Sequence, residues 1–239
     1  PAAQKAVAGQ FVSVYCKDRT KLLPRPISIC EINREAETLR LVYRVTGKGT
    51  GTEEFSRLKA GDQVEILGPL GNGFPLTGKK PLVIGGGIGV PPMLELAQAL
   101  SRVLLVEEVK AGRTYGSGDS RQEGRDARVT AVLGYRDSQL FLKEEFEPWA
   151  KVYVSTDDGS AGTKGTVIDA VRENGVEADV IFACGPKPML RAVKAYAAEK
   201  GIPCYVSLEE RMACGIGACL ACVCKSTGED AHSHVHNAR

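Results

Sequence analysis

The stretch PLVIGGGIGVPP, residues 81–92, joins a short apolar run to a glycine-rich turn that leads into a helical pattern. An apolar run followed by glycines, with proline at the start of the next helix, is typical of a strand and turn in an α/β domain. A second turn of this kind, Cys184-Gly185-Pro186, follows the apolar run at residues 180–183 and precedes another helical pattern. Two such turns at the carboxyl ends of parallel strands border one crevice, where this architecture usually binds a nucleotide.

Apolar runs and helical segments alternate through the second half of the chain. They lie at residues 81–84, 92–100, 129–134, 141–146, 151–155, 166–172, 180–183 and 188–199. This alternation predicts a doubly wound parallel-sheet α/β domain with crossover helices. Residues 106–128 are polar and too numerous for the usual connection, so we expect a surface insertion there.

The first third of the chain has a different pattern. Short β-rich runs at residues 10–15, 26–31, 38–45 and 63–67 are separated by turn-forming residues. Closely spaced strands of this kind predict an antiparallel β-barrel. We therefore expect a barrel at residues 1–78, an α/β domain at 79–206 and a small cysteine-bearing segment at 207–239.

Composition favours no class of macromolecular partner. The 239 residues are 43% hydrophobic, with 31 Lys and Arg against 29 Asp and Glu, so a net charge of +2 gives no argument for a nucleic-acid or membrane partner. No run approaches the roughly 20 apolar residues that span a bilayer. The first ten residues also lack a signal-peptide pattern. We expect a cytoplasmic protein.

Cysteines are concentrated near the C-terminal end. Cys214, Cys219 and Cys222 form a C-x4-C-x2-C run, the spacing of plant-type 2Fe-2S sites. Gly215 and Gly217 let the backbone curl and point amides at the sulfurs. The alternatives are buried thiols or a zinc site, but zinc sites usually pair cysteines as C-x2-C twice. The run therefore predicts a 2Fe-2S cluster.

A plant-type cluster needs a fourth thiolate further along the chain. Cys224 is the only later cysteine, and its separation from Cys222 by one residue would strain joint ligation. Histidines could replace cysteines as in Rieske centres, but His232, His234 and His236 form a pattern more typical of a solvated tail. We expect the fourth ligand to be missing and the chain to be incomplete.

A third feature lies in the predicted barrel. Arg25 precedes Pro26, Ile27 and Ser28 at the start of a strand, and a Gly/Thr loop at residues 47–52, GKGTGT, follows the next strand. An arginine with a hydroxyl neighbour can bind a pyrophosphate, and a Gly/Thr loop adds amides and hydroxyls. Either piece alone is more typical of an ordinary turn.

Together these motifs resemble the ferredoxin–NADP reductase superfamily. Within it, the run EERMACGIGACLAC at residues 209–222 and the run TDDGS at residues 156–160 are most similar to the electron-transfer subunits of type B dihydroorotate dehydrogenases. The resemblance implies FAD binding by Arg25, Pro26, Ile27, Ser28, Val42, Tyr43, Arg44, Gly49 and Thr50. It implies NAD binding by Gly85, Gly86, Gly87, Gly89, Thr156, Asp157, Asp158, Cys184, Gly185 and Pro186. It implies cluster ligation by Cys214, Cys219 and Cys222.

The resemblance also implies an order of electron flow. Hydride moves two electrons at once and a 2Fe-2S cluster accepts one, so a flavin must stand between them. NADH would reduce FAD, and the cluster would pass electrons to the FMN of a catalytic subunit that interconverts orotate and dihydroorotate. In this oxidoreductase subunit no residue is expected to act as acid or base on the pyrimidine.

Alternatives remain open at this stage. The chain could be a related NAD(P)H-linked subunit of a hydrogenase, a sulfite reductase or a ferredoxin-dependent transhydrogenase, or a redox sensor without turnover. Asp157 and Asp158 disfavour the 2′-phosphate of NADP if they face the ribose, whereas Arg136 would accommodate one.

Overall fold

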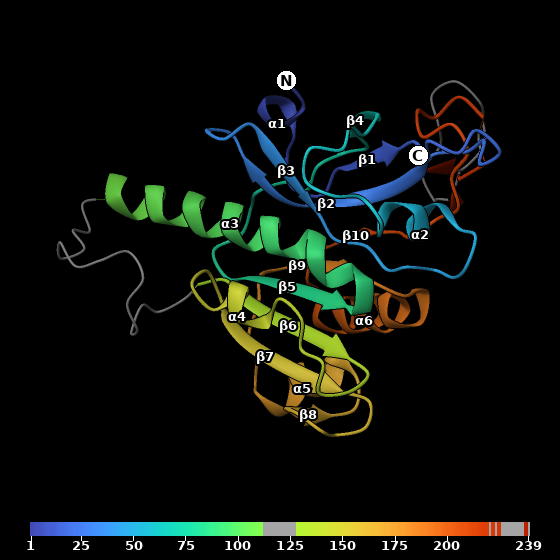
Figure 1. The fold of residues 1–239 in the computed structure, drawn as a ribbon. Coiled ribbons are helices and arrows are strands. Elements are labelled where there is room, and N and C mark those ends of the chain that lie inside the picture. Colours follow the sequence, from blue (N-terminus) through green and yellow to red (C-terminus); the bar gives the residue numbers. More distant parts are fainter. Residues whose placement is uncertain (112–127, 220, 223, 226–236, 239) are drawn as a thin grey trace. The chain divides into compact units, whose positions relative to one another are not determined.

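The computed structural model describes residues 1–111, 128–219, 221–222, 224–225 and 237–238 (Figure 1). Packing divides the chain into two compact units. The first unit comprises residues 1–10, 28–42 and 72–209, and the second comprises residues 11–27, 43–71 and 210–239. The domain bounds at residues 78 and 206 stay a prediction, because these units follow packing rather than continuous stretches of chain.

The first unit contains a six-stranded sheet in the order β10-β9-β5-β6-β7-β8. Every neighbouring pair in it is parallel, which confirms the predicted parallel sheet. Its strands are β5 (Pro81–Gly86), β6 (Thr130–Tyr135), β7 (Lys151–Thr156), β8 (Thr163–Lys164), β9 (Val180–Cys184) and β10 (Cys204–Ser207).

Helices cover both faces of this sheet (Figure 1). They are α3 (Val90–Lys110) on one face, and α5 (Val167–Glu173) and α6 (Lys187–Lys200) on the other. Side chains alternate between faces along a strand, so Val83 of β5 packs in the core under α3, whereas Leu82 and Ile84 pack in the core under α5 and α6. The doubly wound arrangement is confirmed.

Helix α3 is longer than the sequence pattern predicted. Residues 106–110, expected to begin a surface insertion, form its last turns. Leu104 is buried against the sheet, and Glu108 pairs with Arg128, so contacts hold the helix beyond its apolar stretch. The start of the predicted insertion was therefore wrong, and residues 112–127 lie outside the described residues. Short helices α1 (Ala2–Lys5) and α4 (Lys143–Phe146) and the 3-10 turn η1 (Gly87–Gly89) also belong to this unit.

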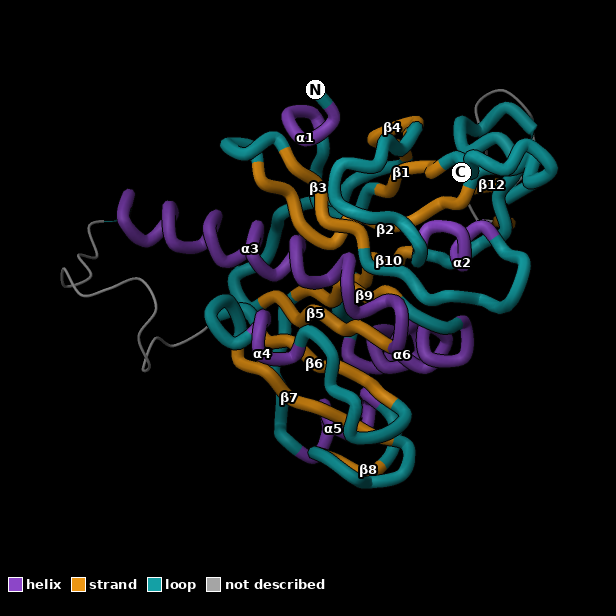
Figure 2. Tube along the Cα trace, viewed as in Figure 1, coloured by secondary structure: helices purple, strands orange, loops and turns teal. Residues whose placement is uncertain are grey.

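The predicted antiparallel domain is present as a four-stranded sheet in the order β3-β2-β1-β4 (Figure 2). Its strands are β1 (Phe11–Val14), β2 (Arg25–Asn33), β3 (Thr38–Leu41) and β4 (Ile66–Leu70), and a short helix, α2 (Gly51–Phe55), precedes β4. The pairs β1·β4 and β2·β3 are both antiparallel.

Strand β3 ends earlier than predicted. Val42, Tyr43 and Arg44, expected on this strand, follow its last residue, Leu41. Val42 packs against the core of the first unit and the Tyr43 ring packs edge-on against Phe55 at a centroid distance of 6.1 Å. Both side chains are therefore packed although their residues lie outside the strand ladder. Among the described residues, no helix is long and apolar enough to span a bilayer.

Candidate functional site

The two glycine turns predicted to border a crevice lie at the same edge of the parallel sheet. From β5 the chain builds β6, β7 and β8 on one side, and β9 and β10 on the other. Gly85 is in register with Cys184, so the turns after β5 and β9 begin side by side. A reversal of strand order of this kind is where α/β proteins usually bind nucleotides.

Close backbone contacts hold these two turns together. A Cβ atom at Gly89 would lie 2.2 Å from the carbonyl oxygen of Cys184, so only glycine fits there. Pro91 and Pro92 occupy the first turn of α3 and have no N–H to donate. Donors for an anion at this turn must therefore come from residues 87–89, an arrangement that fits a pyrophosphate.

Cys184 has a buried thiol at the end of β9, where the second turn begins. The residue is 3% exposed. Burial raises the pKa of its thiol to about 12, and a hydrogen bond with Ser207 lowers it in part. Ser207 was not predicted from the sequence, because β10 is short and half-exposed. Ser207 pairs with Cys184 in the parallel ladder of β9 and β10. A prediction of strand β10 would therefore have placed Ser207 beside Cys184.

The loop after β7 is held by its own hydrogen bonds. The Thr156 hydroxyl donates to the carbonyl of Ala161 at 2.7 Å. The Asp158 carboxylate accepts from the hydroxyl and backbone N–H of Ser160, which lowers its pKa. The N–H of Asp158 donates to the carbonyl of Arg136 at 3.3 Å. Asp158, expected to favour NAD, and Arg136, expected to accommodate NADP, therefore lie on adjacent loops. Thr156 thus holds the loop that carries Asp157 and Asp158.

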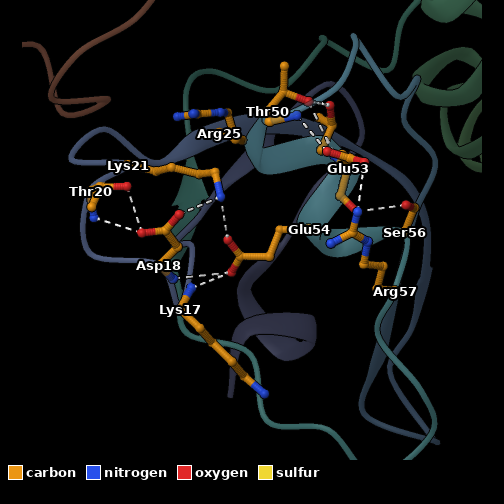
Figure 3. A network of polar contacts seen from close by, with 12 residues as sticks. Lys17, Asp18, Thr20, Lys21, Arg25, Thr50, Glu53, Glu54, Ser56 and Arg57 are labelled. Carbon is orange, nitrogen blue, oxygen red and sulfur yellow. Dashed lines mark hydrogen bonds and ion pairs between the residues drawn. The ribbon is translucent and has the colours of Figure 1, made fainter.

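In the second unit, Arg25 and the Gly49-Thr50 loop are brought together around α2 (Figure 3). Thr50 caps α2 by accepting from the N–H of Glu53, and its hydroxyl donates to the Gly47 carbonyl at 2.7 Å. A Cβ at Gly51 would lie 2.8 Å from Nε of Arg25, so the arginine packs directly on the start of the helix. Gly51 belongs to the predicted Gly/Thr loop, and its lack of a side chain makes this approach feasible.

The other predicted FAD residues are divided between the two units. Pro26 and Ile27 follow Arg25 on β2, and Ile27 is buried. Ser28 and Val42 belong to the first unit.

An ion network braces the segment before Arg25 against α2 (Figure 3). Lys21 Nζ lies 2.8 Å from Asp18 and 3.1 Å from Glu54. Glu54 also accepts from the backbone N–H groups of Lys17 and Asp18. Beside the network is a cavity of about 490 Å³ whose lining includes Gly49 and Thr50. The network fixes one wall of this cavity.

The cysteine run forms a loop whose glycines have left-handed backbone angles, with φ of 71° at Gly215 and 79° at Gly217, as predicted. The N–H of Cys219 donates to Sγ of Cys214 at 3.4 Å. This bond and those from the amides of Ile216 and Ala218 lower the pKa of Cys214 to about 6. Backbone amides that stabilise a thiolate also stabilise the sulfurs of a thiolate-bound metal cluster, so the surroundings of Cys214 suit a cluster ligand.

The three cysteines are not gathered around one point. Within the part of the chain that the structure describes, no three Cys, His, Asp or Glu side chains are arranged to hold a metal ion. Cys214 and Cys219 lie together, and Cys222 is half-buried further along the loop. The side chain of Cys224 and the histidines His232, His234 and His236 lie outside the described residues.

Comparison with known proteins assigns the chain. Residues 2–74 match an oxidoreductase FAD-binding domain and residues 83–195 an oxidoreductase NAD-binding domain. Residues 209–236 match the iron–sulfur cluster binding domain of dihydroorotate dehydrogenase B. The dihydroorotate dehydrogenase B (NAD(+)) electron transfer subunit of Geobacillus sp. (strain WCH70) is 44% identical over 223 residues, covering 91% of this chain and 77% of that protein. The chain belongs to this family of electron transfer subunits.

Other members of the electron transfer subunit family are equally similar. The Streptococcus mutans protein is 43% identical over 93% of this chain and 79% of its own length. Among solved structures, that of an NADH-dependent reduced ferredoxin-NADP oxidoreductase matches with a TM-score of 0.72 and 30% identity, over 93% of this chain and 73% of that one. A ferredoxin reductase of carbazole 1,9a-dioxygenase shares the fold with a TM-score of 0.62 and 22% identity, over 84% of this chain and 60% of that one.

Proposed function

We propose that this chain takes electrons from NADH and delivers them to the FMN of a dihydroorotate dehydrogenase catalytic subunit. The observation that carries the proposal is the presence, in one chain, of FAD-binding, NAD-binding and dihydroorotate dehydrogenase B iron–sulfur domains. When bound, FAD accepts the electron pair of a hydride and releases electrons singly, and a 2Fe-2S cluster carries single electrons. The orotate chemistry belongs to the partner, so no acid or base on this chain is required. The proposed compartment is the cytoplasm.

The crevice of the first unit would hold NAD. The amides of the turn at residues 87–89 would bind its pyrophosphate, and the closeness of Gly89 to Cys184 supports this role. Gly85, Gly86, Gly185 and Pro186 would let the nucleotide approach the backbone. The neutral Cys184 thiol adds no charge beside the ring that exchanges hydride.

Residues of the second unit would hold the FAD pyrophosphate. The guanidinium of Arg25 supplies a cation, and the Gly49-Thr50 loop supplies a backbone amide and a hydroxyl. In the described structure the N–H of Gly49 donates to Glu53 at 2.5 Å, so a carboxylate occupies a donor that a phosphate would use. Pro26, Ile27, Ser28, Val42, Tyr43 and Arg44 would contact the remainder of the flavin.

Cys214, Cys219 and Cys222 would ligate the cluster. The amides that lower the pKa of Cys214 would stabilise the added negative charge of the reduced cluster. We retain the proposed domain bounds of 1–78, 79–206 and 207–239 for FAD, NAD and cluster binding.

The proposal is tested by adding NADH, under anaerobic conditions, to the protein loaded with FAD and iron, with NADPH as a comparison. We expect NADH to bleach the flavin and iron–sulfur absorbance and to support turnover with an artificial acceptor. A redox sensor would show no turnover with the acceptor although both cofactors were present, and that result would contradict the proposal. Faster reduction by NADPH would contradict the NAD preference.

A further inference from the structure

The cysteine loop rests on strand β1 at Gly215. A Cβ atom built at Gly215 would lie 2.9 Å from Oγ of Ser13 and 3.4 Å from Cδ1 of Leu70. Ser13 is 1% exposed, so its hydroxyl is enclosed at this contact. The residue that follows Cys214 therefore meets the antiparallel sheet through its backbone, and a side chain there would displace the Ser13 hydroxyl or the loop.

Strand β1 is firmly held where this contact occurs. Ser13 is in register with Leu67 and Val14 with Ile66 of β4. The N–H of Tyr15 continues the pairing by donating to the carbonyl of Glu65 at 3.0 Å. Because Ser13 is enclosed on a paired strand, a larger group at Gly215 must displace either the Ser13 hydroxyl within the packed interior or the cysteine loop.

The chain segment from Ser13 to Cys16 also reaches the end of the loop that carries Gly49 and Thr50. Three residues after Ser13, Sγ of Cys16 would lie 2.6 Å from a Cβ at Gly51, the residue that follows Thr50. Three residues of extended chain span about 10 Å, at about 3.3 Å per residue. One paired segment thus touches the loop that carries Cys214 and the loop that carries Thr50, all within the second unit.

We infer that Ser13 and Gly215 are positioning residues, and that their contact sets the separation between the cluster and the FAD along β1. The inference rests on the proposed function. The process concerned is the passage of one electron at a time from reduced FAD to the oxidised cluster, with NADH as the source of the pair. Its rate depends on the separation, so a loop displaced from Ser13 receives electrons more slowly.

The chain offers a matched pair of glycines for the test. Gly215 and Gly217 both have left-handed φ, but nothing lies within 4 Å of a Cβ at Gly217. Gly217→Ala therefore measures the cost of the backbone angle alone, and Gly215→Ala adds the contact with Ser13. In rapid mixing with NADH, flavin and cluster bleaching are followed separately. We expect cluster reduction in Gly215→Ala to be measurably slower than in Gly217→Ala, because the electron must cross a longer gap when the loop is displaced from Ser13. Flavin reduction should be equally fast in both.

Removal of the Ser13 hydroxyl provides the rescue. In the double variant Ser13→Ala with Gly215→Ala, the added methyl group finds room, so the rate should return to that of Gly217→Ala. A second measurement needs no cofactor: thermal unfolding of the unloaded chain should show Gly215→Ala less stable than Gly217→Ala, with Ser13→Ala removing the difference.

The outcomes separate this inference from the proposed function. If NADH reduces the cluster of the unaltered protein but Gly215→Ala and Gly217→Ala slow it equally, or Ser13→Ala does not rescue, the inference is overturned and the function stands. If NADH does not reduce the cluster of the unaltered protein at all, both are overturned.

Discussion

Glu95 of α3 accepts a hydrogen bond from the backbone N–H of Ile32 in β2 at 2.8 Å. The carboxyl group is 3% exposed. Burial raises its pKa, and the Ile32 bond, with Arg102 and Arg34, lowers it in part. Both residues belong to the first unit, so this bond ties helix α3 to the part of β2 in that unit. A buried polar pair of this kind is specific because neither group has water as an alternative partner.

Replacing Glu95 should destabilise the protein by an amount that depends on whether the new side chain can still accept the hydrogen bond from Ile32. Glu95→Ala leaves the buried N–H of Ile32 unpaired, so we expect the free energy of unfolding to fall by about 1–3 kcal/mol in urea titrations. Glu95→Gln retains an acceptor oxygen and should lose less. Glu107→Ala, at an exposed position on the same helix, should stay within about 0.5 kcal/mol of the unaltered protein. Equal losses in Glu95→Ala and Glu107→Ala would show that the bond contributes nothing.

The raised pKa of Glu95 also predicts a pH dependence of stability. The folded state binds the proton of this carboxyl more tightly than the unfolded state, whose value is near 4.5. Its contribution to stability is therefore complete below 4.5 and is lost as pH rises through the folded pKa. Glu95→Gln does not titrate, so its stability relative to the unaltered protein should increase from pH 4.5 towards pH 8. Parallel stability curves would contradict the burial of an ionisable carboxyl.

Gly89→Ala should weaken nucleotide binding selectively. Its methyl group would collide with the Cys184 carbonyl, which would force the two crevice turns apart. We expect the Kd for NADH to rise by about tenfold or more, equivalent to about 1.4 kcal/mol, with FAD still bound. Gly201→Ala is the control, because nothing lies within 4 Å of a Cβ there and the residue ends α6 at its far end from Pro186. Unchanged NADH affinity in Gly89→Ala would exclude this crevice as the nucleotide site.

Serine substitutions should separate cluster ligands from other cysteines. Cys214→Ser, Cys219→Ser and Cys222→Ser should each lose most of the bound iron and its visible absorbance, because thiolates are the ligands that hold 2Fe-2S clusters. Cys204→Ser, on strand β10 outside the run, should retain both. Full iron content in Cys219→Ser would remove that residue from the ligand set.

Sequence patterns predicted the elements whose side chains are buried on one or both faces. β5, β9 and α6 were found because apolar runs and flanking glycines or prolines mark them. The pattern did not reveal that α3 continues to Lys110, because its last turns are exposed. It also placed Val42 on a strand, although side-chain packing takes this residue out of the ladder.

The candidate site likewise combines local features, which the sequence shows, with long-range contacts, which it does not. Glycine turns and cysteine spacing are local features and were visible in the sequence. The pairs Glu95–Ile32 and Ser13–Gly215 join residues far apart along the chain, and one partner in each pair takes part only through its backbone. No residue type signals such a contact, so only the structure could reveal it.

The central claim, an electron relay from NADH to a dihydroorotate dehydrogenase partner, is tested most directly by reoxidation with orotate. The protein loaded with FAD and iron is reduced by one equivalent of NADH without oxygen, and orotate is then added with or without a purified FMN-containing dihydroorotate dehydrogenase catalytic subunit. We predict that the flavin and iron–sulfur absorbance returns only when both orotate and the partner are present, and that dihydroorotate is formed. Reoxidation by orotate without the partner, or none with it, would contradict the relay.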